Sequence, residues 1–160
     1  MKGHADVIKI LNDVLTAELT AINQYFVHAE MCANWGYKRL YAQIRKEAIS
    51  EMKHAEALIE RVLYLEGVPN VQRLGVINIG ETVKEQLDSD LKLEYDAVER
   101  LNPGVIRCRE LNDAGSAMLL EKILAEEEEH VDWIEAQIEA IKQMGIENYL
   151  AQQLGEGEED

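Results

Sequence analysis

Glycine and proline are scarce in this chain, which has ten glycines and two prolines among its 160 residues. Alanine, leucine, glutamate, lysine and isoleucine dominate instead. This composition is typical of a mostly helical protein and leaves little room for β-sheet. A chain of this length can bury one sizeable core, so we expect a single domain.

Basic residues are also few: 16 lysines and arginines stand against 31 aspartates and glutamates, for a formal net charge of −15 at pH 7. A surface of this sign would repel a phosphate backbone, which excludes nucleic acid as an expected partner. The excess negative charge fits a cation partner, but it also fits an ordinary solvated surface with a repulsive field. Composition does not decide between these two interpretations.

Long apolar runs of signal-peptide or membrane-spanning length are absent as well. We therefore expect no membrane partner and take a cytoplasmic location as the default prediction. The only two cysteines, Cys32 and Cys108, lack the short spacing of a thiolate metal site or a redox motif. In a reducing compartment they are predicted to be free thiols without a chemical role.

Apolar residues recur at three- and four-residue steps through the first 65 residues, which is the periodicity of amphipathic helices. The first helix is predicted from Val7 to Trp35 and ends at Gly36. The second is predicted from Lys38 to Leu65, just before Gly67. The short join between them predicts an antiparallel hairpin.

The segment from Glu66 to Gly80 breaks this pattern and forms a long connection. About 15 residues extend to roughly 50 Å at ~3.3 Å each, whereas a helix of about 25 residues is only about 37 Å long. The connection can thus run the length of a bundle and make the third helix parallel to the second. That third helix is predicted to start at Glu81 or Thr82, with a kink at Pro103 rather than an end there.

The fourth helix is predicted to follow Asn112 or Asp113, which are good capping residues, and to end at Gly145. Residues Ile146 to Leu154 predict one more short helix, and the acidic segment Gly155 to Asp160 is predicted to be a disordered tail. Together these patterns predict an all-α fold, an antiparallel four-helix bundle with one long crossover connection and a short C-terminal fifth helix.

A doubled Glu-x-x-His motif is the most specific feature of the sequence. Each copy follows a further glutamate by 33 positions, and the whole constellation repeats with an offset of 76. Three correspondences at one offset, all between residue types that bind metals, are hard to obtain by chance. The six residues are Glu18, Glu51, His54, Glu94, Glu127 and His130.

These six residues predict a dinuclear metal site inside the bundle. Helix positions three apart lie about 60° from each other and ~4.5 Å apart along the axis, so each Glu-x-x-His pair can reach one ion. Carboxylate and imidazole together suit iron, manganese or zinc, and the expected bridging ligands between two ions are Glu51 and Glu127. Two divalent ions also neutralise four glutamates, whereas each unpaired buried carboxylate costs several kcal/mol.

The alternative is that glutamates and histidines on acidic helices simply face solvent, which is the usual explanation for a single such motif. Two copies at equal spacing in a four-helix pattern favour the metal site instead. Within the run of four glutamates only Glu127 is in register with His130. We expect Glu126, Glu128 and Glu129 to be solvated or to lie between subunits.

Tyr25 lies two helical turns after Glu18 on the same stripe, and Trp133 follows His130 by three residues. Either aromatic can serve beside the metals as a supporting group or an electron donor to an oxidising pair. Large aromatics on a buried stripe are also common as plain core. We keep Tyr25 as a candidate catalytic residue.

Met52 is the immediate neighbour of Glu51 and therefore points about 100° away from the metal face. It is predicted to lie on the outside of the bundle, at a contact between subunits. A twofold contact can bring a residue opposite its own copy, and two facing thioethers can hold a haem iron. The alternative is ordinary interface packing by a flexible methionine.

With these residues in place, the chain resembles a bacterioferritin over residues 1–154, as a ferritin-like di-iron domain. The resemblance implies that the six motif residues bind two irons and that Met52 ligates haem b across a subunit dimer. It further implies a hollow homo-oligomeric shell of 24 subunits built from haem-bridged dimers. Fe(II) is then oxidised by dioxygen or hydrogen peroxide, and Fe(III) accumulates as a mineral. A small ferredoxin is implied as the electron donor for iron release.

Some positions depart from the pattern of this family. Asn148 matches a residue that lines a fourfold channel in similar shells, but Ala151 stands where some relatives have glutamine. Lys46 and Ser50 stand where some members carry a histidine and an aspartate on the cavity-facing side. Leu58 replaces a tyrosine that some relatives have near the metals. The resemblance therefore does not carry over to this chain a fully polar channel lining or an additional inner-surface iron site.

The main functional hypothesis is iron storage and detoxification by a ferroxidase, which makes the protein an Fe(II):oxygen oxidoreductase. A second hypothesis is a discrete di-iron oxidase or peroxidase that stores nothing, which a small oligomer would favour. A third is a non-catalytic acidic helical bundle whose repeat is a relic of duplication. Failure to bind metal in stoichiometric amounts would favour that third hypothesis.

Overall fold

The structure, a computed structural model, describes residues 1–155 and contains there five α-helices and no β-strand. None of the helices in this part of the chain has the length and apolar character that crossing a membrane requires. The predicted acidic tail begins at Gly155, and residues 156–160 lie outside the described part. The helices are α1 (Ala5–Trp35), α2 (Lys38–Tyr64), α3 (Val83–Glu110), α4 (Ala114–Met144) and α5 (Ile146–Gln153).

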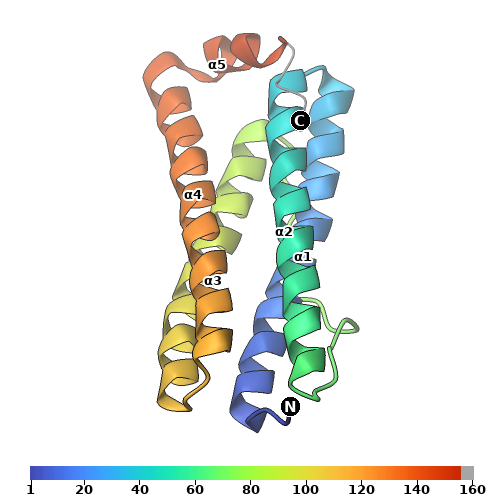
Figure 1. Cartoon of the computed structure of the whole chain (residues 1–160). Helices are drawn as coiled ribbons and strands as arrows, with labels where there is room; N and C mark the ends of the chain where they lie inside the picture. The colour runs from blue at the N-terminus through green and yellow to red at the C-terminus, as the bar shows by residue number, and fades with distance from the viewer. Residues whose placement is uncertain (156–160) are drawn as a thin grey trace.

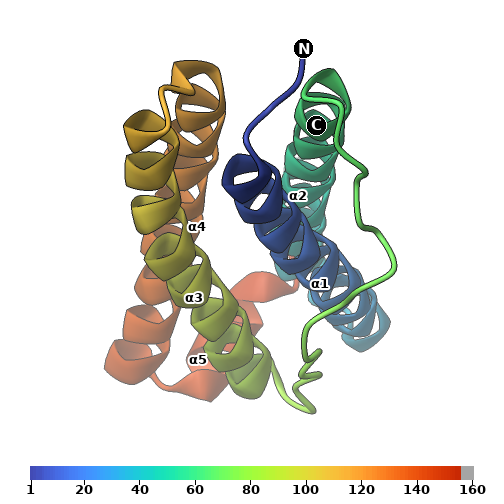
Figure 2. The same ribbon diagram turned by 90° about the horizontal axis from the view of Figure 1, so that it is seen from below.

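Two helical hairpins, α1 with α2 and α3 with α4, pack side by side to form the bundle (Figure 1). The connection between α2 and α3 runs along the outside of the bundle from one end to the other, so α3 runs parallel to α2 (Figure 2). Helix α5 crosses the end of the bundle and contacts α4 and α2 (Figure 1). The predicted all-α fold with its long crossover and its fifth helix is therefore confirmed.

The helix ends follow from capping chemistry. Gly36 ends α1 at φ 87°, in the left-handed region that costs glycine least. The Thr82 hydroxyl accepts a hydrogen bond from the Glu85 amide at the start of α3, and Asp113 accepts one from the Ser116 amide at the start of α4. Helix α3 continues through Pro103, so the alternative in which this proline ends the helix is wrong.

Two apolar clusters fill the two ends of the bundle. The first joins the start of α1, the end of α2, the end of α3 and the start of α4, and includes Leu11, Leu58, Leu101 and Leu120. The second joins the opposite ends of the same helices with α5, and includes Leu40, Leu87, Ile134 and Tyr149. Leu58, which replaces a tyrosine of some relatives, is fully buried in the first cluster. The middle of the bundle, between these clusters, is left for polar residues.

A buried polar network attaches the crossover to the bundle. Asp90 on α3 accepts hydrogen bonds from Gln24 Nε2 and from His28 Nδ1 on α1, both at 2.8 Å. On its other side, His28 Nε2 accepts the Gly80 amide at 3.0 Å, which leaves the ring proton on Nδ1. The Gln24 side-chain carbonyl accepts the Asn78 amide at 3.0 Å. The end of the crossover is thus held by side chains inside the bundle.

We predict that Asp90→Ala loosens the crossover. Without this carboxylate, the buried Gln24 amide and the His28 ring N–H lose their acceptor. We expect the free energy of unfolding to fall by about 3 kcal/mol. Hydrogen exchange measured by mass spectrometry should also speed up in the segment that carries the Asn78 and Gly80 amides.

The matched control is Asp88→Ala, on the same helix, where the exposed carboxylate pairs with Lys84. This variant should leave both stability and exchange nearly unchanged. Equal exchange of the crossover in the two variants would contradict the anchoring role of Asp90.

Candidate metal centre

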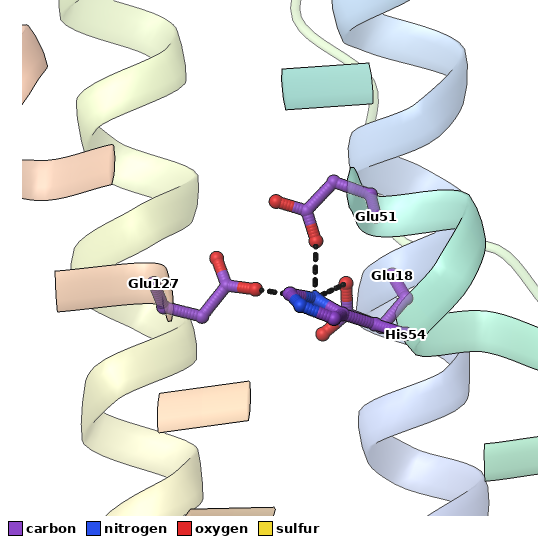
Figure 3. Close-up of side chains that lie close together, drawn as sticks. All are labelled: Glu18, Glu51, His54 and Glu127. Atoms are coloured by element: carbon purple, nitrogen blue, oxygen red, sulfur yellow. Dashed lines mark hydrogen bonds and ion pairs between the residues drawn. The ribbon is translucent and has the colours of Figure 1, made fainter. Parts of the chain in front are cut away.

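All six residues of the repeated motif meet in the middle of the bundle. Glu18 projects from α1, Glu51 and His54 from α2, Glu94 from α3, and Glu127 and His130 from α4. Figure 3 shows four of them, with the three carboxylates directed toward the His54 ring. The four glutamates are each at most 3% exposed, so the sequence prediction placed their side chains correctly.

The first half of the centre gathers around His54. Its Nδ1 lies 3.0 Å from Glu127 Oε1, 3.2 Å from Glu51 Oε2 and 3.4 Å from Glu18 Oε2 (Figure 3). These carboxylates come from three different helices. One oxygen or nitrogen from each of the four residues lies within 4.8 Å of the others, which is a spacing that one ion can bridge.

The second half gathers around His130 in the same way. Its Nδ1 lies 3.1 Å from Glu51 Oε1, 3.3 Å from Glu94 Oε1 and 3.6 Å from Glu127 Oε2. Glu51 and Glu127 thus belong to both halves, and each presents a different oxygen to each histidine. This is the arrangement expected of two carboxylates that bridge a pair of metal ions.

The donor atoms lack the partners that buried polar groups normally have. Glu18 Oε2, Glu51 Oε1, Glu127 Oε1 and His130 Nδ1 are buried without a hydrogen-bond partner among the described residues. Some lie within ion-pair distance of a neighbour, but without the geometry of a hydrogen bond. Buried groups of this kind are rare in folded proteins. Four carboxylates and two imidazoles aimed at a shared space fit two ions of iron, manganese or zinc.

Burial and the crowding of carboxylates shift the pKa values of the residues in the centre. Burial, and then repulsion by Glu51, raises the pKa of Glu18 well above its usual range. Burial, and then repulsion by Glu127, does the same for the pKa of Glu94. Burial disfavours charge on the histidines as well, but the surrounding carboxylates raise the pKa of both His54 and His130.

The pKa of Glu127 moves in the opposite direction. Burial alone would raise it, but contacts with Glu94, His130 and His54 outweigh burial and lower the pKa. These shifts favour protons on Glu18, Glu94, His54 and His130 over four ionised carboxylates with neutral imidazoles. Such protons balance the negative charge that two divalent ions would otherwise neutralise.

A cavity of about 320 Å³ leads to the centre between α1, α3 and the crossover. Four of the carboxylates and Tyr25 line its inner part, and the crossover contributes Gly75, Val76 and Asn78. Exposed Lys92 and partly buried Asp96, paired at 3.1 Å, also line this cavity. The centre is therefore buried but reachable by a small ion or molecule.

Tyr25 is fully buried, and its hydroxyl donates a hydrogen bond to Glu94. Burial and the neighbouring Glu94 raise the pKa of this phenol well above its usual range. The structure thus places Tyr25 in direct contact with one of the motif glutamates. Trp133 is only partly buried and packs against the second apolar cluster, which agrees with the core alternative.

Met52 lies away from the centre, on the outer face of α2, and is 46% exposed. The predicted orientation, outward from the bundle, is therefore correct. Among the departures noted from the sequence, Lys46 is exposed and Ser50 is partly buried.

Glu126 corrects one prediction. We expected it to be solvated or to lie between subunits, but its Oε2 lies 2.6 Å from His54 Nε2. Its side chain is 36% exposed, so it reaches the ring from the surface of α4. Register with His130 along α4 does not indicate a contact that crosses to α2. Glu128 and Glu129 are exposed, as predicted.

Glu47 is a buried carboxylate beside the centre that the sequence analysis missed. It is 3% exposed and accepts a hydrogen bond from Gln43 Nε2 at 3.2 Å. Burial raises its pKa to about 7. The available signal was its position one turn before Glu51, on the same face of α2.

Comparisons of the sequence and of the structure with known proteins all find ferritin-like proteins. A family model described as "Ferritin-like domain" matches residues 8–144. Bacterioferritin BfrA of Mycobacterium tuberculosis (strain ATCC 25618 / H37Rv) is 52% identical over 152 residues, which cover 95% of this chain and 96% of that protein. The bacterioferritin of Streptomyces coelicolor is 44% identical over 94% of this chain and 90% of its own length. A solved structure of M. tuberculosis BfrA matches with a TM-score of 0.96 at 51% identity, covering 97% of this chain and 98% of that chain.

The protonated centre predicts that metal binding releases protons. When the metal-free protein takes up two Zn(II) ions per subunit, we expect up to four protons to leave, one each from Glu18, Glu94, His54 and His130. Because the ions compete with these protons, apparent affinity should rise with pH. Calorimetric titration in buffers of different ionisation enthalpy measures the number released.

The variant Glu18→Ala should release fewer protons than the unmodified protein, because one protonated group is gone. A binding heat that does not depend on the buffer would contradict the protonated state of the metal-free centre.

Proposed function

The chain belongs to the bacterioferritin family, and on that premise we propose that it is a ferroxidase that oxidises Fe(II) and stores the Fe(III) as a mineral inside a hollow shell. Family membership supports iron storage and assembly into an oligomeric shell. The observation that carries the ferroxidase proposal is the pair of overlapping groups that share Glu51 and Glu127. Two neighbouring irons can give up two electrons together, which a single isolated site cannot do.

In this proposal Fe(II) is the substrate, and the six motif residues hold it. Glu18 and His54 bind one ion, Glu94 and His130 bind the other, and the two shared glutamates bridge them. The iron supplies the redox chemistry, with dioxygen or hydrogen peroxide as the electron acceptor. The protein contributes geometry, because residues on four packed helices hold their donor atoms in place before iron arrives.

The same residues also bind and release protons. Glu18 and Glu94 carry protons in the metal-free centre, and losing them leaves carboxylates that neutralise the incoming ions. In this proposal Tyr25 gives one electron to the oxidant when fewer than two are available from iron, and its phenolic proton passes to Glu94, to which it is hydrogen-bonded. The burial of the centre excludes bulk water, and the cavity between α1 and α3 supplies the route for entry.

Storage requires a shell, and we propose that this shell has 24 subunits. We also propose that it acts in the cytoplasm. A closed assembly encloses the mineral and keeps it in solution. Neither Lys46 nor Ser50 supplies the histidine or aspartate that an inner-surface iron site uses in some relatives. Oxidised iron therefore passes from the centre to the mineral without help from such a site.

Met52 supports a second part of the proposal, a haem b bound between two subunits. Its thioether is exposed on the outer face of α2, where a twofold partner can bring an identical thioether opposite. Partly buried apolar side chains of α1, including Leu19, Ile22 and Phe26, are available for such a contact. This haem would pass electrons from a small ferredoxin to the mineral when iron is released.

The ferroxidase proposal predicts that Glu18→Ala abolishes rapid iron oxidation. Loss of one carboxylate removes a ligand from the His54 half, so Fe(II) added in air should oxidise about as slowly as in protein-free buffer, which is a drop of at least about tenfold. Stopped-flow absorbance of the Fe(III) product measures the rate. Size-exclusion chromatography checks that the shell still forms.

The matched control is Glu30→Ala, which removes an exposed glutamate from the same helix. It should oxidise iron at the unmodified rate. If the unmodified protein is no faster than buffer, the ferroxidase proposal fails.

The haem proposal predicts that Met52→Ala loses haem. After expression with ample haem, the unmodified protein should show a Soret absorption band and the variant should not, because its axial ligand is gone. Met118→Ala is the control, since Met118 is also exposed, on α4. A Soret band of equal strength in Met52→Ala would refute the role of this methionine.

A further inference from the structure

The two histidines of the repeated motif have different surroundings. His54 uses both ring nitrogens: Nδ1 faces the three carboxylates of its half, and Nε2 lies 2.6 Å from Glu126 Oε2. The ion pairs of His130 all involve Nδ1, and none within residues 1–155 involves its Nε2. One ring is therefore held from both sides, and the other from one side only.

This difference arises at a single position of the internal repeat. An offset of 76 relates Glu51 to Glu127 and His54 to His130, and the same offset relates Ser50 to Glu126. Glu126 supports the histidine of the opposite hairpin, so the equivalent support for His130 at the repeat position would have to come from Ser50. Glu47 interacts with His130 electrostatically, but within residues 1–155 its carboxylate accepts from Gln43 and makes no hydrogen bond or ion pair with His130. Serine has a short uncharged side chain, and it donates instead to Glu126 Oε2 at 3.4 Å. The repeat thus supplies a carboxylate to one histidine and not to the other.

The contact with Glu126 affects how His54 can bind a metal. A histidine that binds a metal through Nδ1 is neutral and carries its proton on Nε2. A carboxylate that accepts this N–H fixes the tautomer and the ring orientation, and it makes Nδ1 a stronger donor. Glu126 is placed to do this for His54. It directly precedes the bridging Glu127 on α4, so its backbone is fixed by the same helix that positions the centre.

We propose that Glu126 is a positioning residue that makes the Glu18–His54 half of the centre the tighter metal site, while Ser50 leaves the Glu94–His130 half weaker. The two ions then load in order, with the first bound on the His54 side. The inference rests on the proposed function for its biological meaning, because it assigns an order to the binding of the substrate iron. The metal-binding asymmetry itself does not require oxidation.

The test uses Co(II), which binds carboxylate and imidazole ligands and has visible absorption bands that depend on its coordination. The full-length protein, freed of metal, is titrated with Co(II), and the variants are Glu126→Ala, Glu126→Gln and the control Glu129→Ala. We expect two binding steps in the unmodified protein. Glu126→Ala should weaken the tighter step by about 10- to 100-fold and leave the other step unchanged.

Two comparisons separate positioning from a general effect of charge. Glu129→Ala removes the same charge from an exposed site on the same helix, so it should leave both steps unchanged. Glu126→Gln keeps an oxygen that can accept the Nε2–H, so it should recover part of the affinity lost in Glu126→Ala. It also retains the shape of the side chain if alanine impairs folding.

Anomalous diffraction from crystals with less than one Co(II) per subunit identifies the half that fills first. We expect higher occupancy on the Glu18–His54 side in the unmodified protein, and loss of this preference in Glu126→Ala. Unchanged Co(II) affinity in Glu126→Ala, equal weakening in Glu129→Ala, no recovery in Glu126→Gln, or the same occupancy ratio in both proteins would each overturn the proposal. A protein that binds Co(II) as expected but fails to oxidise Fe(II) would contradict only the proposed function.

Discussion

The burial of four like-charged carboxylates in the middle of one helical bundle is the constraint on which the rest of the structure depends. Carboxylates at this depth cannot all be ionised unless positive charge lies among them. In the metal-free centre the raised pKa values of Glu18, Glu94 and the two histidines favour protons as the source of that charge. Two divalent ions would supply the same charge at the same place.

Stability and function are separated along the bundle axis. Apolar clusters at the two ends supply the hydrophobic burial, so the middle can keep polar groups that weaken folding. The network of Gln24, His28 and Asp90 adds a second buried polar region, but there every group has a partner. That network joins the end of the crossover to α1 and to α3, the helix that carries Glu94. The two buried polar regions therefore differ, because the network is satisfied by hydrogen bonds and the centre is not.

The internal repeat holds at the motif residues and at the turns between paired helices, but not at several positions around the centre. The turns obey the same offset as the motif residues, since Gly36 and Asn112 are 76 positions apart and both have positive φ, 87° and 60°. With equal distances from the turns, the paired helices bring their side chains to one level. Elsewhere the halves diverge: Tyr25 corresponds to Leu101, Met52 to Glu128 and Ser50 to Glu126. The fold is thus close to symmetric, whereas the surroundings of the two halves of the centre are not.

The sequence by itself determined the helices, their parallel or antiparallel directions and the six motif residues. Each of these depends on spacing along one helix or on the length of a connection. Both are numbers of residues that can be read from the sequence. Only the tertiary structure decided that Glu126 supports His54, that Glu47 is buried and that Tyr25 donates to Glu94. These are contacts between side chains of different helices, or burial beneath them. They depend on how far one helix is shifted and rotated against its neighbour and on which rotamer each side chain adopts, and residue spacing does not specify these quantities.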